Sequence, residues 1–221
     1  MCVLTQSLNN KKKTMKSTNT TLHVFPFEGV HGVGKTTTMK EFAGEKILGK
    51  SVICMDESFV PTMKTNFAPQ GVYSETCWTT DWFKRLEYVC KPYYNEKTNI
   101  YSGKSVVIVA DRSPFSSIMY VDEVPRPSWM FGMIKDLISR FKEKNIHIHT
   151  IHLTNDQDVI WEQIVKRLES EQWRKKLNEH KKDWFLEKYE LYNKTFSSIW
   201  DTEIYGDFKE SATNFIQSKI V

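Results

Sequence analysis

The stretch FEGVHGVGKTTT, residues 27–38, contains the pattern G-x-x-x-x-G-K-[ST] between Gly29 and Thr36. A short apolar run at 22–27 precedes the pattern and predicts a buried strand, and helical spacing follows it over 35–47. A strand that enters the pattern and a helix that leaves it are the setting in which such a loop holds phosphate. The sequence therefore predicts a loop that binds the phosphates of a nucleotide.

The residues of this loop have distinct expected tasks. Glycines allow backbone N–H groups to turn inward around phosphate oxygens, and the helix N-terminus adds its dipole. We expect Lys35 to contact the β- and γ-phosphates and Thr36 to offer its hydroxyl to Mg²⁺. His31 is interpreted as a spacer, and Thr37 as a helix-entry residue with a secondary phosphate contact. The predicted nucleotide contacts in this stretch are Gly29, Val30, His31, Gly32, Val33, Gly34, Lys35, Thr36 and Thr37.

Strand and helix patterns alternate over the rest of the chain. Strands are expected at 51–55, 105–110, 146–153 and 203–205, and helices at 78–94, 128–144, 156–168, 178–200 and 209–220. The alternation predicts an α/β fold with a roughly five-stranded parallel sheet and helices on both faces, a three-layer sandwich. Residues 66–75, with Pro69 and Gly71, are expected to form a loop. Residues 1–21 are expected to be a disordered tail, and 22–221 a single domain.

Bulk composition excludes several classes of protein. The net charge of +4 in 221 residues is mild, so no nucleic-acid partner is expected. No apolar run approaches the ~18 residues of a membrane span, and no secretory leader is visible. The four cysteines form no C-x-x-C pair and are expected to be free thiols in a reducing compartment. We expect a cytoplasmic enzyme, with the nucleus as an open alternative.

Acidic residues follow two of the predicted strands. Asp56 and Glu57 come after 51–55, and Asp111 comes after 105–110. Ligands in parallel sheets bind outside the carboxyl ends of the strands, so these acids should lie at the same edge as the loop. One acid could accept the proton of an acceptor hydroxyl, and the other could hold Mg²⁺. Arg112, next in the chain, could neutralise phosphoryl charge in the transition state.

A basic segment at about 166–178 separates two predicted helices. It contains Lys166-Arg167 and Arg174-Lys175-Lys176. Such a segment could close over phosphates, exclude water and stabilise the transferred charge. A solvated charged hinge is an equal alternative on composition alone.

Together these motifs resemble the deoxynucleoside kinase family, of the cellular and herpesviral thymidine kinase type, within the thymidylate kinase superfamily. The resemblance spans about 22–221 and includes two further stretches near the C-terminus. The residues that carry it are FEGVHGVGKTTT, Asp56-Glu57, Asp111-Arg112-Ser113-Pro114, the arginines of 166–178, Leu186-Glu187-Lys188 and Gly206-Asp207-Phe208-Lys209. It implies a P-loop kinase fold with a lid at about 166–178.

The resemblance implies an enzyme that phosphorylates the 5′-hydroxyl of a deoxynucleoside, with ATP as donor and Mg²⁺ as cofactor. Glu57 is similar to the family's general base, and Arg112 to the arginine that bridges the 5′-oxygen and the phosphates. Asp111 is similar to the acid near Mg²⁺.

The remaining ATP contacts are also implied by the resemblance. Arg167 and Arg174 match the lid arginines, and Asp207 and Phe208 match the loop that recognises adenine. Family members are often homodimers, so a homodimer is an open expectation.

On the acceptor side the sequence departs from the family. The family has Glu-Pro after the second strand, whereas this chain has Glu57-Ser58, which leaves either Asp56 or Glu57 as the base. The family's base-reading glutamine is missing between 78 and 94. The candidate substrate contacts there are Trp78, Asp81, Trp82 and Arg85, of which the tryptophans are also candidate core residues.

Other functions remain open at this stage. A thymidylate kinase would need additional arginines for its phosphorylated acceptor, and only Arg85 lies between 56 and 101, which favours a nucleoside. A P-loop regulator without turnover would leave the basic segment unexplained, and the guanine signature Asn-Lys-x-Asp is absent. A nucleic-acid end kinase would need a basic channel, which the sequence does not display.

Overall fold

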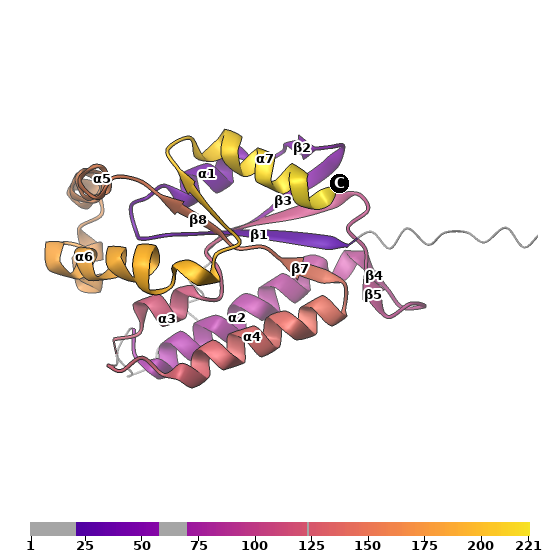
Figure 1. The fold of residues 1–221 in the computed structure, drawn as a ribbon, viewed down its shortest axis with the longest axis horizontal. Coiled ribbons are helices and arrows are strands. Elements are labelled where there is room, and N and C mark those ends of the chain that lie inside the picture. Colours follow the sequence, from indigo (N-terminus) through magenta and orange to yellow (C-terminus); the bar gives the residue numbers. More distant parts are fainter. Residues whose placement is uncertain (1–20, 58–69, 123) are drawn as a thin grey trace, which may run out of the picture.

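The computed structural model describes residues 21–57, 70–122 and 124–221, and it contains a mostly parallel sheet flanked by helices (Figure 1). The order in the main sheet is β2-β3-β6-β1-β8-β9, and β7 pairs with the first half of β1. Its strands are β1 Leu22–Glu28, β2 Lys46–Ile47, β3 Lys50–Met55, β6 Val106–Asp111, β7 Ile146–Ile148, β8 Ile151–Thr154 and β9 Thr202–Tyr205. Only β2, at the edge, pairs antiparallel among these described strands. The α/β expectation is confirmed in this coarse form.

Helices cover both faces of the sheet. In Figure 1, α1 (Lys35–Glu41) and α7 (Phe208–Ile220) lie above the sheet. The opposite face is covered by α2 (Val72–Cys90), α3 (Ser116–Tyr120) and α4 (Ser128–Glu143). The helices α5 (Gln157–Ser170) and α6 (Lys182–Glu190) lie beyond the carboxyl ends of the strands. The other described elements are 3₁₀ turns at Lys91–Tyr93, Gln172–Leu177 and Ser197–Ile199, and a π turn at Leu191–Thr195. A short hairpin is formed by β4 (Tyr94–Asn95) and β5 (Ile100–Tyr101).

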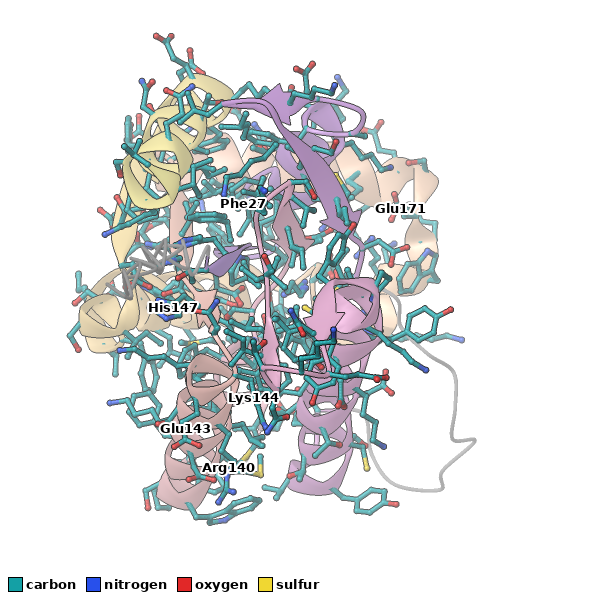
Figure 2. The ribbon with its side chains drawn as sticks, turned by 90° about the vertical axis from the view of Figure 1, so that its right-hand side faces the viewer. Phe27, Arg140, Glu143, Lys144, His147 and Glu171 are labelled. Carbon is teal, nitrogen blue, oxygen red and sulfur yellow. The ribbon has the colours of Figure 1, made fainter. Side chains whose placement is uncertain are left out.

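The central strand β1 contributes to two hydrophobic cores because its side chains alternate between the faces of the sheet. Leu22 and Val24 pack on the α2–α4 side, whereas Phe25 and Phe27 pack on the α1–α7 side. Phe27 is fully buried in the side chains between the helical layers (Figure 2). The neighbouring strand β6 is buried along its whole length, as its β-branched sequence predicts.

Two predicted boundaries on the N-terminal side of the fold are wrong. The helix expected over 35–47 ends at Glu41, and the chain then forms β2, which pairs with Lys50–Met55. Gly49, with φ 79°, makes the turn between β2 and β3. The loop expected at 66–75 gives way to α2, which begins at Val72; residues 58–69 lie outside the described part of the chain.

Two further elements are divided where one was predicted. The strand expected at 146–153 is interrupted at His149 and Thr150, because the Thr150 N–H turns to the carboxylate of Asp201 (2.7 Å). The long helix expected over 178–200 begins at Lys182 and becomes π-helical over Leu191–Thr195. Of the predicted tail, only Thr21 lies in the described residues.

No helix in the described ranges is long and apolar enough to cross a membrane. The cysteines in those ranges, Cys54, Cys77 and Cys90, are all free thiols.

Candidate active site

The loop between β1 and α1 follows a path that only glycine can take at two positions. Gly29 has φ 147°, and a side-chain carbon there would lie 2.4 Å from the carbonyl oxygen of Leu153. Gly32 has φ 86°, and its added carbon would lie 2.5 Å from Ile164. The loop therefore lies directly against the end of β8 and the side of α5, in a conformation unsuited to L side chains.

Lys35 folds back across this loop. Its Nζ donates to the carbonyl oxygens of Gly29 (2.6 Å) and Val30 (3.0 Å). Burial, with a smaller contribution from Arg112, lowers the pKa of Lys35 to about 8. The side chain is thus held inside the loop by two weak, neutral acceptors that an anion could replace.

Thr36 and Asp111 form the next feature, at the end of β6. The Thr36 hydroxyl donates to Oδ2 of Asp111 (2.5 Å). The other oxygen, Oδ1, is buried and has no hydrogen-bond partner in the described part of the chain. A buried orphan carboxylate oxygen beside a threonine hydroxyl fits Mg²⁺, which usually takes one or two carboxylates and completes its shell with water and phosphate oxygens. The described residues contain no group of three or more His, Cys, Asp or Glu that could hold a metal ion.

Arg112 and Glu57 form an ion pair at the ends of β6 and β3. Burial raises the pKa of Glu57, with Arg112 opposing the rise. Burial disfavours the charge on Arg112, but Glu57 and the surrounding groups hold its pKa well above the ordinary range. The guanidinium also lies 4.8 Å from the ring centre of Tyr120.

Asp56 and Glu57 differ in their exposure and in their contacts. Asp56 is exposed, and its backbone carbonyl accepts from Arg85 (2.6 Å). Glu57 is the acid that contacts Arg112. Both residues line the same cavity, but only Glu57 is part of the pair at the strand ends.

A cavity of about 430 Å³ lies over these strand ends. Its wall includes several predicted site residues, namely Thr36, Glu57, Trp78, Asp111, Arg112 and Arg174. It also includes residues that sequence reasoning did not select: Gln70, Glu75, Tyr120, Trp173, Glu179 and Trp184.

Three predicted substrate contacts do not line this cavity. Trp82 is fully buried in the core, and its Nε1 donates to the carbonyl of Arg112 (3.0 Å). Asp81 and Arg85 face each other one helical turn apart, at 3.7 Å. The structure places Trp82 in the core and Asp81 and Arg85 outside the cavity, because the first two turns of α2 line the cavity and its later turns do not.

Glu75 is the missed residue with the most unusual chemistry. It lies one turn before Trp78 on α2, and burial raises its pKa to about 8, with Arg112 opposing the rise. The signal that could have found it is its spacing of three residues from Trp78, which puts both on one helix face. The wrong loop expectation for 66–75 concealed that signal.

Glu28 was missed as well. It ends β1, is fully buried, and accepts hydrogen bonds from the backbone N–H groups of Gly29 (3.1 Å) and Ser113 (3.0 Å). It thus touches the first residue of the loop and the residue after Arg112.

The two predicted lid arginines meet on one carboxylate. Arg167, in the last turn of α5, donates to Glu179 (2.6 Å), and Arg174 donates to the other oxygen of Glu179 (3.1 Å). Arg174 also pairs with Glu171 and lies against the ring of Trp173 (4.6 Å). The side chain of Glu179 is almost fully buried between the arginines.

Five other predicted nucleotide contacts do not line the cavity: His31, Gly34, Thr37, Asp207 and Phe208. The His31 ring is buried against Trp184, with centroids 4.9 Å apart, and burial lowers its pKa well below the ordinary value. A side-chain carbon on Gly34 would lie 3.7 Å from the Phe208 ring, and Asp207 caps α7 by accepting from the N–H of Glu210 (3.3 Å). Thr37 is exposed on α1.

Comparison with known proteins adds little. No protein-family model matches the chain, and no curated protein matches it. Matches do occur among solved structures; one is described as the crystal structure of APE1195, with 12% identity, 91% of this chain and 96% of that chain covered, and a TM-score of 0.45. A proposal about function must therefore rest on the site itself.

Proposed function

We propose that this protein is a nucleoside kinase that transfers the γ-phosphate of ATP to the 5′-hydroxyl of a deoxynucleoside. The observation that carries the proposal is the convergence on one cavity of the segments that follow β1, β3 and β6. They bring Thr36, Glu57 and Arg112 to its wall, with Lys35 directly beside Thr36. Ligands of open α/β sheets bind at this edge.

On the donor side, the loop at 29–34 and the N-terminus of α1 would receive the phosphates of ATP. The ammonium of Lys35 would leave the carbonyls of Gly29 and Val30 for phosphate oxygens, which are stronger acceptors. Thr36 and Asp111 would hold Mg²⁺, which neutralises phosphate charge when bound. Arg174 lines the cavity and could turn from Glu179 to the phosphates.

On the acceptor side, Glu57 would take the proton of the 5′-hydroxyl. The 5′-oxygen forms a bond to the γ-phosphorus while the bond from that phosphorus to the β–γ bridging oxygen breaks. ADP leaves with the electron pair of the broken bond. The guanidinium of Arg112 would stabilise the negative charge on the phosphoryl group in flight.

The charge of the cavity wall favours a neutral acceptor over a nucleotide. Even with Glu75 neutral, its carboxylates outnumber its cations: Asp56, Glu57, Asp111 and Glu179 against Lys40, Arg112 and Arg174. Arg112 and Arg174 are already paired with carboxylates. An acceptor that already carries a phosphate, such as thymidylate, would have to compete with these carboxylates for the two arginines of the wall.

Glu75 and Trp78 are the groups through which the acceptor's base could be held. They lie on the cavity face of α2, at its first turns. With a pKa raised to about 8, Glu75 is largely a neutral acid at pH 7, and a neutral carboxyl group offers one donor and one acceptor side by side. Such a group suits the edge of a base better than it suits an anion.

A substrate panel tests the proposal. Purified protein is given Mg-ATP with each deoxynucleoside and, separately, with thymidylate, and ADP release is measured. Turnover on at least one deoxynucleoside is the expected result, and Lys35→Ala should abolish it. Turnover on thymidylate alone would replace the proposal with a nucleotide kinase. Tight ATP binding without turnover on any acceptor would instead indicate a nucleotide-binding regulator.

A further inference from the structure

Glu28 is a fully buried carboxylate to which the transfer chemistry assigns no task. Its side chain accepts five hydrogen bonds. Oε2 accepts from the Ser113 backbone (3.0 Å), the Ser113 hydroxyl (2.7 Å) and the Ser116 hydroxyl (2.6 Å). Oε1 accepts from the Gly29 backbone (3.1 Å) and the Tyr192 hydroxyl (3.0 Å). All five partners are donors, so this site is built for an acceptor-only group.

The bonds to Oε2 fix the turn that carries Arg112. Arg112 has φ 68°, an unfavourable conformation for a residue with a side chain. Its backbone is held on both sides, by its own N–H to the carbonyl of Phe27 (3.0 Å) and by Trp82 to its carbonyl (3.0 Å). The next residue in the chain, Ser113, donates its N–H to Glu28. Two consecutive residues of the turn are therefore bonded to the end of β1.

The bonds to Oε1 fix two other segments. Gly29 is the first residue of the loop that precedes Lys35, so its N–H bond places the start of that loop. Tyr192 is fully buried in the π-helical turn Leu191–Thr195. Turns of this kind are frequent at functional sites. One carboxylate thus joins the loop, the Arg112 turn and the segment after α6.

We propose that Glu28 is a positioning residue, which holds the Arg112 turn and the start of the loop at the relative position that phosphoryl transfer requires. This inference rests on the proposed kinase function. Glu28 acts through Ser113 and Gly29, because its own side chain does not line the cavity. A small displacement of a charged group from the reacting atoms lowers the rate strongly, so a network that fixes the position of Arg112 supports the reaction.

Glu28→Gln is the sharpest variant, because it keeps the size of the side chain and replaces one acceptor oxygen with a donor. Its amide nitrogen must face donors on one side of the network. We expect kcat to fall at least about tenfold, and by more than the affinity for a fluorescent ATP analogue falls. Ser116→Ala is the matched control: it removes one of the five bonds and leaves both backbone bonds in place, so its loss should be smaller.

A double-mutant cycle separates positioning from general loss of structure. If Glu28 acts through Arg112, Glu28→Gln should lower kcat by less than about threefold when Arg112 has already been replaced with lysine. Losses that multiply in the double variant, or an unchanged kcat in Glu28→Gln, would overturn the proposal. If Glu28→Gln does not fold, Ser113→Ala takes its place in the same cycle.

Unliganded crystal structures keep this inference distinct from the proposed function. The inference expects residues 112–116 to be displaced in Glu28→Gln while β3 and β6 superpose on the wild-type strands. An undisturbed turn would refute it, whether or not the wild-type protein phosphorylates a nucleoside. Absence of wild-type turnover with a displaced turn would count against the kinase function alone.

Discussion

The carboxylate of Glu57 contacts the guanidinium of Arg112 at the cavity wall, and the two side chains arrive there from the neighbouring strands β3 and β6. Each group is largely buried and stabilises the charged form of the other. In the proposed reaction Glu57 is the base and Arg112 the phosphoryl-binding cation, so the pair already holds the two groups that the transfer step needs.

Replacing Glu57 with glutamine should lower kcat by about 10²- to 10⁴-fold, because the 5′-hydroxyl loses its proton acceptor. Affinity for ATP should change little, since Glu57 lies on the proposed acceptor side. Steady-state kinetics and titration with a fluorescent ATP analogue measure the two effects. The matched control is Asp56→Asn, which alters the exposed neighbouring acid and should retain most of the activity. The reverse ranking of the two variants would assign the base to Asp56.

The acid limb of the pH profile should report Glu57. A general base works only when deprotonated, so activity falls as pH drops through its pKa. Because burial raises that pKa from 4.5, the midpoint of the limb should lie above 4.5 in the profile of kcat/KM. Glu57→Gln should remove this limb from its residual activity. A wild-type rate that stays flat below pH 4.5 would show that no group of this kind limits the reaction.

Glu75 predicts a separate effect on the alkaline side. Its pKa of about 8 means that the neutral carboxyl predominates below pH 8 and the anion above it. The neutral form can donate a hydrogen bond to the acceptor, so the KM for the deoxynucleoside should rise as pH increases through about 8. Saturating ATP is needed in this measurement, because the free Lys35 also titrates at about 8 and bound phosphates keep it charged.

The variant that checks this effect is Glu75→Gln. Its amide carries a donor and an acceptor at every pH, so acceptor binding should persist and the pH dependence of KM should vanish. A KM that still rises near pH 8 in this variant would place the titrating group elsewhere.

Gly32→Ala should destabilise the protein and weaken nucleotide binding. The added carbon meets the side chain of Ile164 at 2.5 Å, and φ is 86°. Gly44→Ala is the matched control: its φ of 80° is similar, but its added carbon meets nothing within 4 Å. We expect the control to cost about 1 kcal/mol from the backbone alone and Gly32→Ala to cost more. Thermal unfolding and ATP titration are compared between the two variants, and the excess loss in Gly32→Ala measures the effect of the clash beyond backbone strain.

The fold was largely predictable because its signals are local. The continuous β-branched run at 105–110 became the fully buried β6, and the acids after 51–55 and 105–110 did come together at one cavity. Parallel strands that end at one edge force that result, whatever the details of the helices.

The residues of the proposed acceptor side were not predictable in the same way. The position of Glu75 depends on where α2 begins, and Gly71 and Pro69 favour a loop until packing against α3 and the sheet is known. The position of Trp82 also depends on tertiary packing, because its indole is buried in the core and donates a hydrogen bond to the carbonyl of Arg112. The Glu28 network joins residues distant in sequence, and no local pattern announces it.

Transfer of radiolabel from [γ-³²P]ATP tests the central claim most directly. A deoxynucleoside panel is compared with the matching 5′-deoxy analogues, which lack the acceptor hydroxyl. The account predicts a labelled nucleoside 5′-monophosphate from at least one deoxynucleoside, none from its 5′-deoxy analogue, and at least about a hundredfold less product with Glu57→Gln. Label that appears only as inorganic phosphate, or only on a thymidylate acceptor, would contradict it.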